Sequence, residues 1–181
     1  MQQPQEESKQ IIRTGNISLI LDSYEDIFSD FDPRPYPERA MSDDFITECK
    51  KVAREKTKKE GIELRLLIPK DKRNKNEEVK IKKRLKEYFT KNFHEKQKAR
   101  KKEKNSGMIW LMAGATLITL AAYLYGKEGI LFNFLMVLLE PSGWFSAWTG
   151  LDKIFAGILN KQTDLEFYKA MSKIEVFFQE Y

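Results

Sequence analysis

Hydrophobic residues concentrate in one long stretch of the chain, while the flanking parts show short periodic patterns. Residues 108–125 (MIWLMAGATLITLAAYLY) are eighteen residues without a charged side chain. At about 1.5 Å of rise per residue, such a helix spans roughly 27 Å, close to the thickness of the hydrocarbon core of a bilayer. A polar connection at 126–129 leads into a second apolar segment, residues 130–149. The pattern predicts an α-helical membrane hairpin of two transmembrane helices over residues 106–150.

Aromatic residues occur where such a hairpin would meet the membrane surfaces. Trp110 falls near one end of the first helix, and Tyr123 and Tyr125 fall near the other end. Trp144 and Trp148 fall toward the end of the second apolar segment. Because amphipathic rings prefer the boundary between lipid and water, we interpret these residues as interface anchors.

The second apolar segment is interrupted by Glu140 and Pro141. Proline cannot donate to the carbonyl of Val137, and its ring crowds that turn. Two geometries are open: a kinked helix that crosses the membrane with Glu140 near its middle, which we favour, or a break followed by a short tilted helix. Glu140 most simply caps the helix that follows the proline. Contact with a partner, or ion or proton handling, are the alternatives.

Small residues recur on both predicted transmembrane helices and let helix backbones approach closely. They either seal the hairpin within one chain, which we favour, or mediate oligomerisation. The residues are Gly107, Gly114 and Ala121, spaced by seven, and Ser142, Ser146 and Gly150, spaced by four.

The region before the hairpin, residues 17–105, is predicted to be a cytoplasmic α+β region with the order β-α-β-α. Residues 17–21 and 62–68 have strand composition, and Ser42 can cap a helix over residues 43–58. Asn76 can cap a long basic amphipathic helix that runs toward the hairpin. Because an isolated two-stranded sheet is marginal, a second copy, a partner or the C-terminal helix is expected to complete it. Residues 1–16 are expected to form a disordered tail.

Residues 151–181 are predicted to form amphipathic helices, one at the membrane surface and one in the cytoplasm. The second helix is indicated by a capping-box spacing of Thr163 and Glu166. Its apolar stripe would consist of Phe167, Met171, Ile174 and Phe178.

The segment FSDFDPRPY, residues 28–36, combines aromatics, acids and two prolines in a way that indicates a rigid loop. We expect Arg34 to pair with an acid and the aromatic rings to pack under the sheet. A recognition loop for another protein is the main alternative, and a carboxylate pair or a divalent-ion site is the weakest. The residues concerned are Phe28, Asp30, Phe31, Asp32, Arg34 and Tyr36.

Charge is divided unevenly along the chain, whose net charge is +5. Residues 1–45 carry a balance of −6, whereas residues 70–104 carry +10. Because the basic block ends just before the first apolar helix, it favours attraction to an anionic cytoplasmic leaflet over nucleic-acid binding. The positive-inside rule then predicts a two-pass protein of the cytoplasmic (plasma) membrane with both termini in the cytoplasm.

Catalytic and cofactor motifs do not emerge from the sequence. One cysteine, Cys49, and one histidine, His94, leave no cluster with metal-ligand spacing, so no metal or other cofactor is expected. Phosphate-binding loops, dinucleotide fingerprints and nucleophile elbows are missing. We therefore expect a non-enzymatic scaffold or adaptor, either homo-oligomeric or an accessory subunit of a membrane complex. The alternative is an oligomeric channel or transporter subunit with Glu140 near the pathway.

Overall fold

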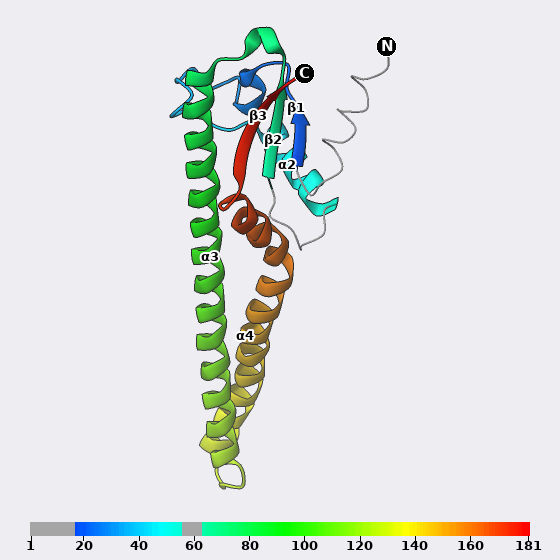
Figure 1. The fold of residues 1–181 in the computed structure, drawn as a ribbon. Coiled ribbons are helices and arrows are strands. Elements are labelled where there is room, and N and C mark those ends of the chain that lie inside the picture. Colours follow the sequence, from blue (N-terminus) through cyan, green and yellow to red (C-terminus); the bar gives the residue numbers. More distant parts are fainter. Residues whose placement is uncertain (1–16, 56–62) are drawn as a thin grey trace. The chain divides into compact units, whose positions relative to one another are not determined.

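The computed structural model describes residues 17–55 and 63–181, apart from the side chains of 55 and 156–162. The predicted tail, residues 1–16, lies outside the described residues. The described chain forms two compact units. We call residues 17–93 and 166–181 the sheet unit and residues 94–165 the hairpin unit. The helices and strands of the described chain are, in order, β1 (Ile17–Ile20), η1 (Tyr24–Ile27), α2 (Asp43–Glu55), β2 (Glu63–Ile68), η2 (Lys70–Lys72), α3 (Lys75–Leu124), α4 (Ile130–Met171) and β3 (Glu175–Glu180) (Figure 1).

The sheet unit is built on three parallel strands in the order β1-β2-β3, with β2 in the centre. Alternate side chains of β2, Leu64, Leu66 and Ile68, are fully buried, as the two-residue period of a strand requires. Helix α2 and the first part of α3 contribute side chains to the same core. The last turn of α4 contributes there too, through Phe167, Tyr168 and Met171.

The third strand corrects the prediction for the C-terminus. Helix α4 ends at Met171, and residues 175–180 pair with β2 instead of continuing an amphipathic helix. Thr163 and Glu166 lie inside α4, so they do not cap a separate helix. This pairing gives the backbone groups at the second edge of β2 hydrogen-bond partners and places Phe178 in the hydrophobic core. The chain therefore completes its own sheet, and neither a second copy nor a partner is needed for this purpose.

The predicted strands and helices before the hairpin are present with small shifts at their ends, and the predicted residues 56–58 and 62 lie outside the described residues. The helix expected at the membrane surface after residue 150 is not separate, because α4 continues through it to Met171. The Ser42 hydroxyl accepts a hydrogen bond from the amide of Phe45 at 3.4 Å at the start of α2. At the start of α3, the cap is Asn74 and not Asn76. Its side-chain oxygen accepts from the amides of Asn76 at 3.0 Å and Glu77 at 3.4 Å. These bonds satisfy amide groups that a helix start leaves without partners.

The hairpin unit consists of the second part of α3 and the first part of α4, joined by a short turn. Gly126 and Gly129 adopt φ angles of +84° and +132° there, a backbone region that suits glycine. Both helices are long and apolar enough to cross a membrane. Helix α4 runs without interruption through Pro141, so the broken geometry, with a new helix starting at the proline, is wrong.

Candidate interaction surfaces

The loop between η1 and α2 is closed at its base by backbone pairing. Phe28 and Met41 form an antiparallel bridge, and the amide of Ser29 donates to the carbonyl of Ala40 at 2.9 Å. The amide of Ser42 donates to the carbonyl of Ile27 at 3.0 Å. We call residues 28–41, which these contacts close at the base, the FSDF loop. Its ends are fixed, so its tip is presented from a defined base.

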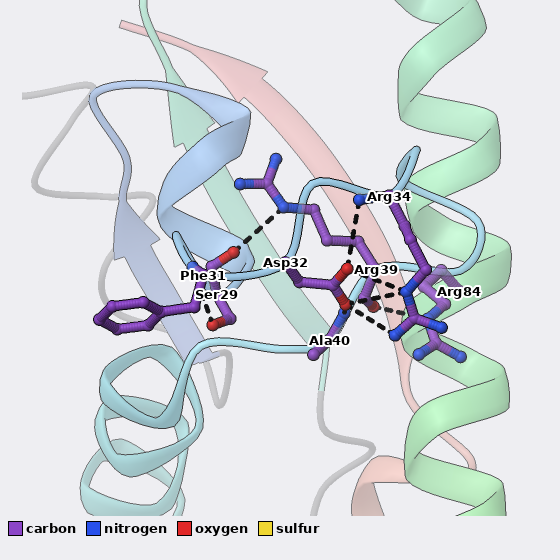
Figure 2. A network of polar contacts seen from close by, with 7 residues as sticks. All are labelled: Ser29, Phe31, Asp32, Arg34, Arg39, Ala40 and Arg84. Carbon is purple, nitrogen blue, oxygen red and sulfur yellow. Dashed lines mark hydrogen bonds and ion pairs between the residues drawn. The ribbon is translucent and has the colours of Figure 1, made fainter.

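Asp32 organises the inside of the FSDF loop (Figure 2). Its carboxylate accepts hydrogen bonds from Arg34 Nε at 2.9 Å and Arg34 Nη2 at 2.7 Å. It also accepts from the backbone amides of Arg34 at 3.2 Å and Ala40 at 2.7 Å. The Arg34 guanidinium, followed by the Ala40 amide, holds the pKa of Asp32 well below its usual range. Asp32 therefore remains ionised at any physiological pH and keeps the loop tied across its width.

Two further arginines attach the loop to its surroundings. Arg39 Nε donates to the carbonyl of Ser29 at 3.2 Å, and the Arg39 guanidinium forms an ion pair with Glu25. Arg84, on α3, donates from Nε to the carbonyl of Arg39 at 3.0 Å (Figure 2). The sequence reasoning missed both residues. Arginines placed to bind backbone carbonyls leave no spacing pattern in a sequence.

The three aromatic side chains of the loop have different environments. Phe28 is buried and stacks on Tyr36, with ring centroids 5.0 Å apart, as expected for residues that pack beneath the loop. Phe31 is 98% exposed and points away from the Asp32 network (Figure 2). The expectation that Phe31 packs under the sheet is therefore wrong. The amide of Phe31 donates to the Ser29 hydroxyl at 3.4 Å, so the backbone that carries this ring is itself hydrogen-bonded.

The acidic residues of the loop do not form a metal site or a carboxylate pair. The Asp32 oxygens are used by Arg34 and Ala40, and Asp30 is exposed. Among the described residues, no group of three or more His, Cys, Asp or Glu side chains is arranged to hold a metal ion. A shallow pocket of about 380 Å³ lies beside the loop, lined in part by Pro35, Tyr36 and Pro37. The rest of its lining is charged and consists of Glu25, Arg34, Arg39, Glu77 and Lys80.

In the hairpin unit, the predicted small residues lie mainly between the two helices. Gly107, Gly114 and Ala121 of α3 are buried, as are Ser146 and Gly150 of α4. A Cβ atom at Gly114 would lie 2.5 Å from the amide nitrogen of Ala147, and one at Gly150 would lie 2.5 Å from the amide nitrogen of Leu111. The structure therefore places these residues in the contact between the two helices of one chain, where the favoured interpretation expects them.

Ser142 is an exception, because it is exposed, and Gly143 takes its place in the contact. A Cβ at Gly143 would lie 2.7 Å from Ile118 Cγ1, and Gly143 faces Gly114 as Gly150 faces Gly107. The signal for Gly143 was present in the sequence. In an antiparallel pair the seven residues from 107 to 114 must match the seven from 150 back to 143.

Glu140 and Pro141 lie on the outer surface of the hairpin unit. The same antiparallel register places Glu140 about level with Leu117, in the middle of the apolar stretch 108–125. No side chain among the described residues forms a hydrogen bond or ion pair with Glu140. Since α4 is continuous, Glu140 does not cap a new helix, and that interpretation is wrong. Glu140 is therefore an exposed carboxylate without a side-chain partner among the described residues.

The five aromatic residues predicted as interface anchors are all exposed on the hairpin unit, namely Trp110, Tyr123, Tyr125, Trp144 and Trp148. Two are covered in part by lysines. Lys127 Nζ lies 4.2 Å from the ring centroid of Tyr123, and Lys153 Nζ lies 5.8 Å from that of Trp110. Outward-facing rings beside a cation suit a boundary between apolar and polar surroundings.

Comparison with protein-family models, with curated proteins and with solved structures yields no match to this chain. Function is therefore inferred from the geometry of the described residues.

Proposed function

We propose that the chain is a two-pass protein of the cytoplasmic membrane that acts as a non-enzymatic scaffold or adaptor. Its sheet unit and both termini lie in the cytoplasm, and the FSDF loop binds another protein there. The observation that carries the adaptor role is the 98% exposure of Phe31 on a loop fixed by Asp32 and Arg34.

The membrane assignment is supported by the outer surface of the hairpin unit. Large apolar side chains cover it, which is unusual for a surface that faces water. The core helix of a soluble protein would bury such side chains, whereas these are exposed; they include Ile109, Met112, Leu120, Leu131, Phe134, Val137 and Phe145. The basic residues of α3 that precede the apolar stretch support a cytoplasmic location for the sheet unit, through the positive-inside rule.

The adaptor role is supported by the cost of leaving Phe31 in water. Burying a phenylalanine side chain against a partner contributes about 1.5–3 kcal/mol. Part of the usual ordering cost is avoided, because the backbone on both sides of Phe31 is hydrogen-bonded before any partner arrives. A rigid aromatic anchor on a polar-rimmed surface is a common centre of a protein interface.

A matched pair of variants tests the adaptor role. Phe31→Ala removes the exposed ring, and Val79→Ala removes a 68% exposed apolar side chain of α3 in the same unit. We expect the native mass of the protein, extracted from its own membrane in mild detergent, to fall by the mass of the partner for Phe31→Ala only. A photo-crosslinking amino acid at position 31 should give one discrete adduct that is missing at position 79. Equal native masses and equal adducts for the two positions would refute the adaptor role.

A second candidate function, an oligomeric channel or transporter subunit, is favoured by the position of Glu140. An ionisable side chain at mid-membrane depth costs about 2.5–3.5 kcal/mol on insertion scales, and nothing among the described residues compensates Glu140. Its compensation must then come from another copy or from a water-filled path. Glu140→Gln distinguishes the two: loss of ion flux with assembly intact supports the channel, and loss of assembly without any flux in the wild type supports the scaffold.

A further inference from the structure

A basic pocket lies between α3 and α4 in the hairpin unit, just outside the apolar stretch. It has a volume of about 290 Å³. Among the described residues of its lining, four side chains are cationic and one, Glu103, is a carboxylate. The cations come from both helices and are Arg100, Lys101, Lys104 and Lys153. Ile154 and Leu165 supply apolar wall.

The pocket is fixed in depth relative to the apolar stretch. Lys104 precedes Met108 by four residues, about 6 Å along the helix, and Arg100 precedes it by about 12 Å. Lys153 lies at the same end, because its Nζ donates to the Ser106 hydroxyl at 3.3 Å. The headgroup layer of a bilayer adds several ångströms on each side of the hydrocarbon core. In a membrane-spanning hairpin the pocket therefore lies at the level of lipid phosphates on the cytoplasmic side.

The composition of the pocket indicates an anionic ligand. The single Glu103 carboxylate does not balance the four cations of the lining, so the pocket keeps a positive charge that a bound anion would offset. A planar guanidinium binds phosphate oxygens through two parallel hydrogen bonds, and ammonium groups add charge from the other side. The apolar wall beside the cations suits the glycerol and the first acyl carbons of a lipid and has no use for a free phosphate.

We propose that this pocket binds the phosphate headgroup of one anionic phospholipid from the cytoplasmic leaflet. The proposal rests on the membrane insertion proposed above and adds a defined binding site to it. It differs from a general attraction of the basic block to a charged surface, because only some of the cations of α3 line the pocket. Lys98 and Lys102, on the same stretch of α3, are exposed and lie outside its lining.

Two charge-matched double variants of the full chain test the proposal. Arg100→Gln with Lys153→Gln removes two pocket cations, and Lys98→Gln with Lys102→Gln removes two cations outside the pocket. Each protein is reconstituted in phosphatidylcholine vesicles containing a low fraction of phosphatidylglycerol, and retained lipids are counted by native mass spectrometry. We expect about one phosphatidylglycerol per wild-type chain. The pocket variant should retain about tenfold less phosphatidylglycerol than the wild type, or less still. The control variant should stay within about threefold of the wild type, because it loses only the general attraction of two surface charges to an anionic membrane.

Each of the other possible results overturns a different part of the proposal. Equal losses in the two variants would overturn the pocket in favour of diffuse electrostatic attraction. Displacement of the lipid by millimolar inorganic phosphate would overturn the lipid assignment and identify a soluble phosphate group as the ligand. Vesicle flotation after an alkaline wash monitors insertion separately. A wild-type protein that floats but retains no anionic lipid refutes this inference alone, whereas one that is washed off refutes the membrane assignment as well.

Discussion

Adding one methyl group at Gly114 tests the close approach of the two helices in the hairpin unit. In Gly114→Ala, the new Cβ would lie 2.5 Å from the amide nitrogen of Ala147 and 2.8 Å from the carbonyl oxygen of Gly143. Both are backbone atoms, so no side-chain rotation relieves the contact. Comfortable carbon contacts begin near 3.5 Å, and the helices must therefore separate locally by about 1 Å. Overpacking of this kind costs about 1–3 kcal/mol.

The sign of the effect makes the test decisive. Alanine is favoured over glycine in a helix by about 1 kcal/mol, because glycine loses more backbone entropy on folding. Without a close approach, Gly114→Ala would stabilise the hairpin unit. With it, we expect a net destabilisation, and Gly150→Ala should behave in the same way. Gly143→Ala should cost less, because its closest contact, at 2.7 Å, is with a side-chain atom, Ile118 Cγ1, which can move, and its nearest backbone neighbour, the amide nitrogen of Ile118, is at 3.0 Å.

The three tryptophans provide the assay, because Trp110, Trp144 and Trp148 all lie in the hairpin unit. Their fluorescence, followed during unfolding by sodium dodecyl sulfate in mixed micelles, reports the free energy of unfolding of this unit without interference from the sheet unit. Ala115→Val adds atoms at an exposed position of α3 and serves as the control. An unchanged or increased stability of Gly114→Ala would refute the packing described here.

Three further predictions concern the sheet unit. Cys49 is fully buried, and burial raises the pKa of its thiol to about 12, so we expect no reaction with iodoacetamide at pH 8 until denaturant unfolds the protein. Burial tends to raise the pKa of Glu78, but the hydrogen bond from Arg73 leads the contributions that bring it below its usual range. Because a depressed carboxyl pKa stabilises the fold above the unfolded pKa, Glu78→Gln should cost about 1–3 kcal/mol at neutral pH. In thermal melts, the difference from wild type should start to shrink as the pH falls below the ordinary carboxyl pKa, and should be lost once the pH is below the depressed pKa of the folded state. Asp32→Ala should make the amide of Ala40 exchange hydrogen faster, with no change in the exchange of β2.

The parts of the fold that follow from local patterns were predictable from the sequence. Strand β2 alternates buried and half-buried side chains over six residues, and α2 begins at the expected serine cap. The apolar length of residues 108–125 likewise defines a long helix without reference to anything distant in the chain. Each of these signals is contained within fewer than about twenty consecutive residues, which is why pattern reading recovers them.

The C-terminal strand was missed because the spacing of the apolar residues near it also fits the period of a helix. Phe167, Met171, Ile174 and Phe178 fit the spacing of a helix face, yet the last of them belongs to β3. What decides between helix and strand is the open edge of β2, more than a hundred residues earlier in the chain. Local propensity gives way to such a tertiary contact, and a sequence pattern contains no record of it.

The candidate surfaces also combine features that the sequence predicts with features that it does not. That Arg34 pairs with an acid was predictable, since Asp32 is two residues away. Which of Phe28, Phe31 and Tyr36 faces water was not, because the direction of a side chain in an irregular loop depends on its backbone angles and has no period to reveal it. The adaptor role that we propose depends on the exposure of Phe31, and this exposure is evident only from the three-dimensional structure.

The glycine contacts connect the hairpin to the proposed lipid pocket. Gly107 and Gly150 let the helix backbones meet, and Lys153 follows Gly150 by less than one turn. The same close approach therefore brings Lys153 to Ser106 and beside the cations of α3 that line the pocket. A larger residue at position 150 moves Lys153 of α4 away from the pocket cations of α3. Position 114 lies about 11 Å further along α3 than Gly107, so a larger residue there separates the helices mainly within the apolar stretch. If the pocket binds one headgroup through both helices, Gly150→Ala must weaken lipid retention more than Gly114→Ala does, even where the two variants lose the same stability.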